Sequence, residues 1–178
     1  MPYPKILLNA NAVGRALDRI AHEIAERNEH GNQVVIVGIQ KGGVHLANRL
    51  QKVLEKIWSH EVPLGLIDVS MHRDDHNERL PQNIQPTSVP FDPTGKVVVL
   101  VDDVLFSGRT VRAALDALTD LGRPKAIQLA VLVDRGNREL PIKADFVGKE
   151  VPTSLEERVE VSLREDNADG DAVRLIKP

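Results

Sequence analysis

The sequence predicts a single α/β domain over residues 1–178, with a mainly parallel central sheet flanked by helices. Short apolar segments alternate along the chain with longer amphipathic ones, which is typical of strands that alternate with helices. The segment 97–101 is apolar throughout, as expected of a strand covered on both faces of a parallel sheet. The 178 residues are also enough for one domain with a substantial core.

A first helix is predicted near the N-terminus because Val13, Leu17, Ile20 and Ile24 recur at helical spacing, and Asn11 is its candidate N-cap. The later elements follow in chain order: a strand over 33–39, a Gly-rich turn over 41–43, a helix over 44–58, a strand over 62–71, a strand over 96–101, a helix over 110–121, a strand over 126–133, and weaker strands over 144–151 and 158–163. This alternation supports the parallel sheet.

Three further stretches have their own signals. The helix over 110–121 is expected to stop at Gly122, with Pro124 just beyond it. Residues 72–95 are polar and contain four prolines. This segment is too long for a routine connection, so it forms either a mobile functional loop or a hairpin excursion. The acidic tail after Arg164 is expected to be frayed or to form an edge element.

Composition excludes several classes of protein. The chain has no cysteine, so disulfides and thiolate metal sites are excluded, and a cytoplasmic location is expected. No stretch approaches the roughly 20 apolar residues of a membrane span, and the N-terminus lacks a signal-peptide pattern. A net charge of −3 argues against non-specific coating of nucleic acid, and 3% aromatic residues argue against base-stacking platforms.

Two adjacent carboxylates, Asp102 and Asp103, follow the apolar run 97–101, at a strand end where open α/β sheets bind ligands. The next loop leads to a helix N-terminus, where free N–H groups and the helix dipole favour phosphate. Gly108 allows close backbone approach, and Ser107 and the nearby threonine offer hydroxyls. Because carboxylates bind sugar hydroxyls or hydrated magnesium, the combination suits a phosphorylated sugar. The alternative is an Asp–Asp turn before an ordinary helix.

The complete run VVVLVDDVLFSGRT, residues 97–110, resembles the phosphoribosyl pyrophosphate (PRPP) motif of type I phosphoribosyltransferases. A narrower resemblance, to the PyrR family, covers nearly the whole chain. It rests on the stretches RALDRIAHEIAERN, IDVSMHRDD, VLVDDVLFSGRTVRAALDAL, GRPKAIQLAVLVDRGNRELPIKADFVGK and VPTS. The resemblance implies the type I phosphoribosyltransferase fold, with a flexible loop over about 72–95 and a small hood formed by about 134–178 with N-terminal contributions.

The PyrR family combines a uracil phosphoribosyltransferase with an RNA-binding regulator of pyrimidine operon attenuation. The resemblance implies that Asp102 and Asp103 bind the ribose hydroxyls and that the next loop binds the phosphate. The residues of this PRPP or UMP site are Val104, Leu105, Phe106, Ser107, Gly108, Arg109 and Thr110. Mg²⁺ is the implied cofactor, held mainly by PRPP near the aspartates, without direct side-chain ligation. Uracil N1 then displaces pyrophosphate from ribose C1′ through positioning and charge stabilisation, with no covalent nucleophile.

Two other segments are implied to contact the pyrophosphate. One is the turn after the strand over 33–39, which commonly contains Thr-Arg-Gly in the family. Its residues here are Gln40, Lys41, Gly42 and Gly43. Lys41 supplies a charge without the bidentate fork of arginine, and the alternative is a plain Gly-rich connection. The other is Arg73, which contacts pyrophosphate as the long loop closes and excludes water, or else belongs to a solvated charge cluster.

Uracil is implied to bind under the hood. Phe146 or Val147 packs on the base, backbone groups near Val147 and Val151 contact its edges, and Asp134 and Arg135 line the same pocket. The alternative for Phe146 is a place in the hood core.

RNA is bound in the family by a basic concave surface of the dimer, away from the PRPP loop. The matching positions are Arg19, His22, Arg27, Arg138, Lys143 and Lys149. Arg19 and His22 share a helix face, from which long cations reach phosphates and loop bases. Asp18 and Asn137 depart from the family pattern, and an acid beside the patch weakens phosphate contacts. The alternative is a set of ordinary solvated cations.

The expected function is therefore a uracil phosphoribosyltransferase that is also a UMP-responsive, RNA-binding regulator. The implied partners are PRPP, uracil, UMP, a pyrimidine-operon leader mRNA, and a second copy of the chain in a homodimer or dimer-based oligomer, with no membrane and no DNA. Two alternatives stay open. One is a purely enzymatic type I phosphoribosyltransferase for another base. The other is an RNA-binding regulator with little transferase activity.

Overall fold

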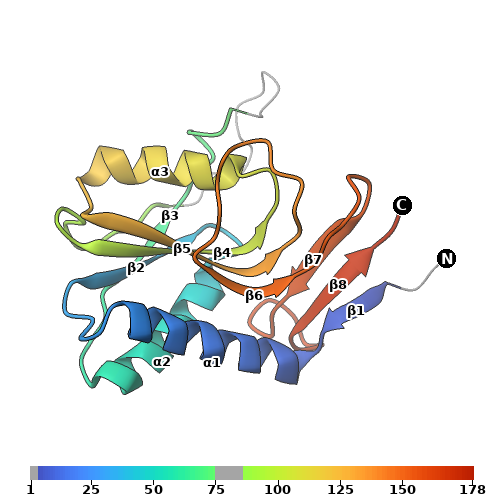
Figure 1. Ribbon diagram of the computed structural model, residues 1–178, viewed down its shortest axis with the longest axis horizontal. Coiled ribbons are helices and arrows are strands. Elements are labelled where there is room, and N and C mark those ends of the chain that lie inside the picture. The colour runs from blue at the N-terminus through green and yellow to red at the C-terminus, as the bar shows by residue number, and fades with distance from the viewer. Residues whose placement is uncertain (1–3, 75–85) are drawn as a thin grey trace.

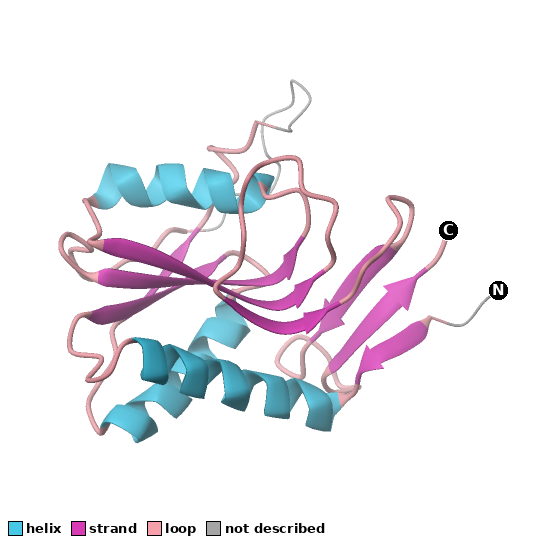
Figure 2. Ribbon diagram, in the orientation of Figure 1, coloured by secondary structure: helices cyan, strands magenta, loops and turns pink. Residues whose placement is uncertain are grey.

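The computed structural model describes residues 4–74 and 86–178, and the predicted α/β fold is confirmed there. The helices are α1 (Ala10–Arg27), α2 (Val44–Trp58) and α3 (Arg109–Leu121), and the strands are β1 (Lys5–Leu8), β2 (Val34–Ile39), β3 (Leu64–Ile67), β4 (Val97–Leu105), β5 (Ala126–Asp134), β6 (Phe146–Glu150), β7 (Arg158–Ser162) and β8 (Ala172–Ile176). Five parallel strands form the central sheet in the order β3-β2-β4-β5-β6. Helix α3 covers one face, and α1 and α2 cover the other (Figures 1 and 2). None of the helices in the described ranges is both long and apolar enough to cross a bilayer.

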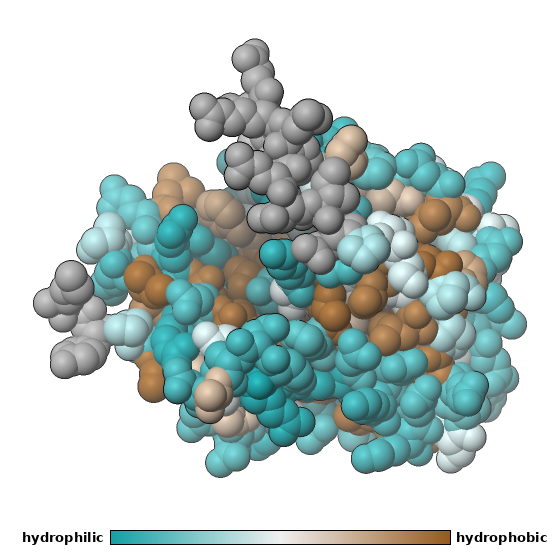
Figure 3. Space-filling view, turned by 180° about the vertical axis from the view of Figure 1, so that it is seen from behind, coloured by the Kyte–Doolittle hydropathy of each residue, from teal (hydrophilic) through white to brown (hydrophobic). Residues whose placement is uncertain are grey.

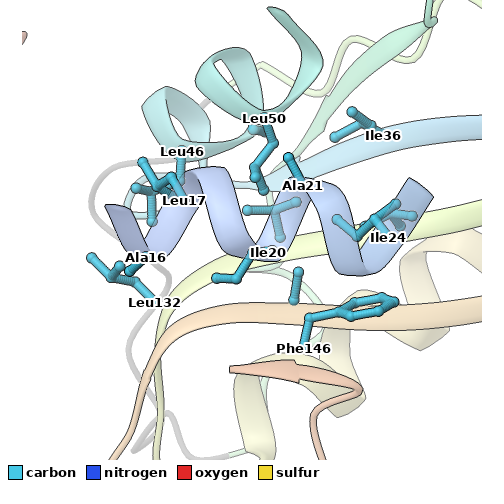
Figure 4. Packing of buried hydrophobic residues seen from close by; sticks show 14 of the residues in the cluster. Ala16, Leu17, Ile20, Ala21, Ile24, Ile36, Leu46, Leu50, Leu132 and Phe146 are labelled. Carbon is cyan, nitrogen blue, oxygen red and sulfur yellow. The ribbon is translucent and has the colours of Figure 1, made fainter. Parts of the chain in front are cut away.

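Helix α1 packs on the sheet through its predicted apolar face, whose four residues are all buried. Figure 4 shows Ile20 and its neighbours between α2 and the sheet. The N-cap prediction was wrong. Asn9 caps the helix, because its Oδ1 accepts a hydrogen bond from the N–H of Ala12 at 2.9 Å, whereas Asn11 already lies in the first turn.

Strand β2 is buried along its whole length, as its apolar sequence predicts, and α2 has the predicted bounds. Leu46, Leu50 and Leu54 of α2 are buried beside α1. Seen from behind, the lower part of the molecule, where the outer face of α2 lies, is mostly hydrophilic (Figure 3). Helix α2 is therefore amphipathic, with one face in the core and the other in solvent.

Helix α3 closes the opposite face and, as predicted, ends before Gly122, whose N–H donates to the carbonyl of Leu118 at 3.2 Å. Val111, Ala114 and Leu118 are buried against the sheet, which gives the second half of the core. Leu121, although part of the predicted apolar side, is 42% exposed because it ends the helix at the surface.

The long segment after β3 returns beside that strand. Strand β3 is shorter than predicted, but Leu66 and Ser88 form an antiparallel bridge, with both N–H···O distances at 2.8 Å. This bridge supports the hairpin alternative for residues 72–95. Residues 75–85, the middle of this predicted loop, lie outside the described residues.

The hood is a three-stranded antiparallel sheet in the order β1-β8-β7, beside the end of the central sheet (Figure 1). The C-terminal tail was expected to be frayed or at an edge, and that prediction was wrong. β8 is the middle strand, and Val173 is fully buried among the core residues, together with Leu8 and Leu163. The four apolar residues of β8 and its pairing on both sides explain its order.

Arg49 of α2 fastens the hood hairpin to the central domain. Its guanidinium donates to Glu165 from Nε at 2.8 Å and Nη2 at 2.6 Å, and to Asp171 from Nη1 at 2.7 Å and Nη2 at 2.8 Å. These hydrogen bonds from Arg49 are the largest cause that lowers the pKa of both acids below their ordinary values. One half-buried arginine therefore satisfies two carboxylates of the hairpin.

We expect Arg49→Gln to lower the free energy of unfolding at pH 7 by about 2 kcal/mol, because two partly buried carboxylates lose their partner. Since the folded pKa values of the acids lie below their unfolded values, the contribution is complete above about pH 5 and is lost as the pH falls through the folded values. Urea unfolding at several pH values measures this, and the gap between variant and wild type narrows in acid. Arg158→Gln, an exposed hood position, is the control; equal effects at both positions contradict the role of Arg49.

Candidate functional site

The candidate site lies where the order of the central sheet reverses. After β2 the chain crosses one face as α2, and after β4 it crosses the other as α3 (Figure 1). The carboxyl ends of these neighbouring strands therefore form a switch point, where open α/β sheets bind ligands. Pairing between them ends at Gly38 and Val101, while β4 and β5 stay paired to Leu105 and Asp134. Strand β4 is thus longer than predicted, and the two aspartates lie inside it, on the part that β2 no longer pairs with.

The loop after β4 has the form of an anion site. Gly108 is the N-cap of α3 and has φ +92°, a left-handed conformation that glycine adopts without steric cost. The first N–H groups of a helix have no intrahelical acceptor, and the helix dipole favours negative charge there. Ser107 Oγ accepts from the N–H of Arg109 at 3.3 Å, which orients the hydroxyl within the loop.

The carbonyl groups of this loop are bound by the segment 135–140. The contacts are Arg135 N–H to Leu105 O at 3.0 Å, Arg138 Nη1 to Phe106 O at 2.8 Å, and the N–H groups of Glu139 and Leu140 to Ser107 O at 2.9 and 3.2 Å. Carbonyl oxygens repel a phosphate, and here three consecutive ones are occupied by donors of the chain itself. The amide side of the loop is therefore the side available to an anion.

A pocket of about 290 Å³ brings most of the predicted PRPP residues together. Its lining consists of Arg73, Asp102, Val104, Leu105, Phe106, Ser107, Gly108, Arg109, Thr110, Val111 and Glu139. Arg73 joins this lining from the distant segment after β3, as the sequence predicts. Asp103, Gln40, Lys41 and Gly42 lie outside this lining.

The two aspartates form an electrostatically costly pair. Asp102 is 6% exposed; its burial, and then the charge of Asp103, raise the pKa of Asp102 well above the ordinary value, while the charge of Arg73 acts in the opposite direction. Asp102 Oδ1 accepts from the N–H of Asp103 at 2.9 Å, and Asp103 Oδ1 accepts from the N–H of Val104 at 2.7 Å. A ligand that brings hydroxyl donors or a hydrated cation offsets this cost.

Magnesium fits this site only with the help of a ligand. Carboxylate oxygens suit Mg²⁺, which keeps several waters and is usually bound through one or two carboxylates and substrate phosphates. Within the described ranges, no group of three or more His, Asp or Glu side chains has the geometry to hold a metal ion. The pair at 102–103 is thus suited to a hydrated ion that phosphate oxygens also coordinate.

The turn at 40–43 packs directly against Asp103. A Cβ atom on Gly42 would collide with the carboxyl group of Asp103, so only glycine leaves room for this side chain. Gln40 Nε2 donates to the carbonyl of Pro86 at 3.2 Å, which connects the turn to the returning arm of the long segment. The peptide bond between Gln40 and Lys41 is cis, and Lys41 is exposed.

Two of the predicted base-binding residues line a second pocket of about 290 Å³. Its lining is Asp134, Gly136, Arg138, Glu150, Val151 and Pro152. The N–H of Val151 donates to the carbonyl of Asp134 at 2.8 Å. The carboxylate of Asp134 accepts from the N–H of Gly136 at 3.0 Å and from Arg138 Nη2. The pocket therefore has a fixed carboxylate at one wall.

Phe146 and Val147 lie on opposite faces of β6. Phe146 is 4% exposed and belongs to the core beneath α1, with Arg27 over its ring at 5.8 Å (Figure 4). The structure thus does not support packing of Phe146 on a base; its place is structural, though in the main core rather than the hood. Val147 packs on the α3 side of the sheet and stays a prediction.

The predicted RNA-binding cations separate into two groups. Helix α1, which carries Arg19, His22 and Arg27, lies alongside β6 (Figure 1). Lys143, just before β6, and Lys149, within it, are both exposed. Arg19 donates to the carbonyls at 147 and 148 at 3.2 and 2.6 Å, and Arg27 donates to the carboxylate at 145 at 2.7 Å. The His22 ring N–H at Nδ1 donates to the carbonyl of residue 18 at 2.7 Å.

Arg138 does not belong with these surface cations. All three guanidinium nitrogens are bound internally: Nε to Ile142 O at 2.8 Å, Nη1 to Phe106 O at 2.8 Å, and Nη2 to Asp134. The structure therefore gives Arg138 a role in the support of the two pockets, and its RNA contact stays a prediction.

Arg135 has a structural role that the sequence does not predict. The residue is 7% exposed, its guanidinium lies 4.1 Å from the centre of the Phe106 ring, and it donates to Thr153 Oγ1 and Ser154 O at 2.9 Å each. Glu139 was also missed, and it accepts from Arg109 Nε at 2.6 Å. The only signal in the sequence was the charge density of 134–139, which does not identify partners.

Comparisons with known proteins agree with this geometry. The phosphoribosyl transferase domain family matches residues 5–164. The Bifunctional protein PyrR of Chloroflexus aurantiacus is 56% identical over 172 residues, which cover 96% of this chain and 94% of the relative. The Bifunctional protein PyrR of Streptomyces coelicolor is 53% identical over 173 residues, with 97% and 90% covered.

Solved structures support the fold. A hypoxanthine phosphoribosyltransferase of Trypanosoma cruzi has a TM-score of 0.73 at 18% identity and covers 98% of this chain and 97% of its own. A hypoxanthine-guanine phosphoribosyltransferase of Bacillus anthracis has a TM-score of 0.72 at 20% identity, with 97% of each chain covered. The predicted type I phosphoribosyltransferase fold is confirmed.

We expect Gly42→Ala to weaken binding of magnesium-PRPP, the ligand expected from the sequence, on the order of 100-fold, because the new Cβ displaces the carboxylate of Asp103. Isothermal titration calorimetry measures this. Gly14→Ala on α1 is the matched control, since a Cβ at Gly14 meets nothing within 4 Å and alanine favours the helix. Undiminished affinity in the Gly42 variant would separate the turn from the ligand site.

Proposed function

The chain belongs to the PyrR family of phosphoribosyltransferases, and from this premise we propose that it transfers the phosphoribosyl group of PRPP to uracil and binds pyrimidine-operon leader RNA in response to UMP. The observation that carries the transferase is the pocket in which an anion loop, the carboxylate of Asp102 and Arg73 meet, with Asp103 adjacent to Asp102 on β4. A phosphate, a pentose diol and a pyrophosphate are the three groups that such a set binds.

The 5′-phosphate binds the amide side of the loop over 107–110, where the helix dipole of α3 adds to the N–H groups. Asp102 and Asp103 accept from the ribose hydroxyls, which orients C1′ toward the incoming base. Hydrogen bonding to the diol relieves the like-charge repulsion of the pair, so ligand binding is stronger than the bare carboxylates suggest. Magnesium, when bound, neutralises the charge of PRPP and of the departing pyrophosphate.

The reaction breaks the bond between C1′ and pyrophosphate and forms the bond from C1′ to N1 of uracil. Arg73 stabilises the negative charge that builds up on the pyrophosphate, and Lys41 and the backbone of the 40–43 turn contribute from the other side. Asp134 and Val151 line the base pocket next to Arg138. Catalysis then comes from positioning and charge stabilisation, with no covalent intermediate.

One observation favours a second candidate, a regulator with little transferase activity. The turn at 40–43 offers a single exposed lysine where an arginine is common in the family, and lysine binds pyrophosphate without a bidentate fork. Turnover with uracil, hypoxanthine and orotate, each with PRPP and magnesium, separates the candidates. Transfer to uracil supports the proposal; transfer to a purine alone points to another base; RNA binding without any transfer points to the regulator.

The RNA surface of the proposal is the α1–β6 edge, defined by Arg19, His22, Arg27, Lys143 and Lys149. Ion pairs with phosphates supply affinity, and unpaired loop bases supply specificity. The proposed active form is a homodimer, or an assembly of dimers, in which two such edges form one concave surface. The net charge of −3 makes this local patch essential, since the chain as a whole repels RNA.

We expect Asp103→Asn to lower transfer to uracil on the order of 100-fold or more, because the ribose diol loses a carboxylate acceptor next to C1′. The assay is UMP formation from uracil and PRPP, with circular dichroism to confirm the fold. Asp169→Asn, an exposed acid of the hood hairpin, is the control and is expected to keep full activity. Normal turnover in the Asp103 variant would remove the sugar-binding role.

We expect Lys143→Gln with Lys149→Gln to weaken RNA binding and to reduce the slope of log K against log salt by about 2, about one unit for each phosphate that the variant no longer neutralises. The lysines are chosen because Arg19 and Arg27 also bind atoms of the β6 region. Filter binding of leader RNA with and without UMP measures the effect, and uracil transfer stays unchanged. Lys56→Gln with Lys125→Gln, exposed elsewhere, is the control. Equal effects in both pairs mean that the α1–β6 edge is not the RNA surface.

A further inference from the structure

Arg73 lies between two residues that are both bound to helix α3. We propose that one of them, Asp74, is a positioning residue that keeps Arg73 at the PRPP pocket by binding the first turn of α3. The inference rests on the proposed function, in which Arg73 acts on the pyrophosphate. Asp74 itself does not line the pocket.

The contact is a carboxylate shared by two arginines. Asp74 Oδ2 accepts from Arg109 Nη1 at 2.9 Å and from Arg112 Nη1 at 3.2 Å. Arg109 is also a member of the phosphate loop and is fixed on its other side by Glu139 at 2.6 Å. The carboxylate therefore connects the segment after β3 to the beginning of α3, where the phosphate loop ends.

The residue on the other side of Arg73 is bound to the same helix. His72 Nε2 lies 3.0 Å from Asp120 Oδ2 in the last turn of α3, and the N–H of His72 donates to the carbonyl of Val69 at 2.9 Å. Nδ1 of His72 is buried and has no hydrogen-bond partner among the described residues, so Nε2 is the ring nitrogen that connects His72 to α3.

The two anchored neighbours of Arg73 limit where its side chain lies. Residues 70–72 form a turn and residue 74 a bend, and residues 72 and 74 both contact α3. The side chain between them lines the pocket with Asp102 and the phosphate loop. The charge of Arg73 also acts on Asp102. Burial and the charge of Asp103 raise the pKa of Asp102, whereas the charge of Arg73 lowers it.

The negative charge of Asp74 also helps to keep Arg73 at the pocket. Three guanidinium groups, from Arg73, Arg109 and Arg112, belong to this small region, and like charges repel. Asp74 neutralises the side of α3 that faces the segment, so Arg73 is able to stay near the phosphate loop before PRPP binds. Pre-positioned charge is worth more to a reaction than charge that must be ordered on binding.

The test is a double-mutant cycle between Asp74→Asn and Arg73→Gln, with magnesium-PRPP affinity measured by calorimetry in the absence of any base. Asp74→Asn keeps the size of the side chain and removes its charge. We expect the affinity to fall about tenfold in each single variant, and the double variant to be no weaker than Arg73→Gln alone, because Asp74 acts through Arg73. Asp74→Glu restores binding to within about threefold of wild type, since it restores the charge.

The matched control is Asp116→Asn, which removes another acid near Arg112, at 3.6 Å, but has no contact with Arg109 or with the segment after β3 among the described residues. We expect it to bind magnesium-PRPP as wild type does. Additive effects in the double variant, or unchanged affinity in Asp74→Asn, overturn the inference, and so does an equally weakened Asp116→Asn. A wild-type protein that binds no magnesium-PRPP would instead contradict the proposed function, which keeps the two failures distinct.

Discussion

Strand β4 extends beyond its pairing with β2, and the rest of the site depends on this mismatch. Both strands are parallel and buried, so neither offers polar groups along the shared length. Past Val101 only β5 is paired with β4 among the described strands, and the unpaired side opens into the crevice between the turn at 40–43 and the loop over 107–110. Helices α2 and α3 lie on opposite faces of the sheet (Figure 1), and the pocket lined by Asp102 and the loop over 107–110 lies at this switch point.

The crevice concentrates charge of both signs. Two carboxylates occupy β4, and the pocket beside them is lined by Arg73 and Arg109, of which Arg109 is also paired with Asp74 and Glu139. The segment 135–140 supports the anion loop from its outer side. Its donors bind the carbonyl groups of the loop, and the guanidinium of Arg135 stacks on the ring of Phe106. Stability is thus supplied on the outer side of the loop, and the inner side is left for a ligand.

The fold and the centre of the site were predictable from the sequence because both depend on local patterns. Apolar spacing predicted α1 and β2, and the run 97–110 predicted the paired acids and the anion loop. The sequence at 146–147 does not show which face of β6 packs into the core. The hydrogen bond from Arg138 to the carbonyl of Phe106 joins segments that are distant in the sequence, so no local pattern predicts it. β8 was missed because its short apolar run follows the acidic stretch 165–171.

Gly42 also has an evolutionary consequence. Any other residue at this position, arginine included, needs a Cβ, and here that volume is filled by the carboxylate of Asp103. A change at this single codon therefore collides with a side chain that the proposed sugar site requires. Position 42 is therefore epistatically constrained, because a compensating shift of β4 must come before a larger residue is tolerated there. Substitutions at Lys41 or around Arg73 are a more accessible route to tighter pyrophosphate binding.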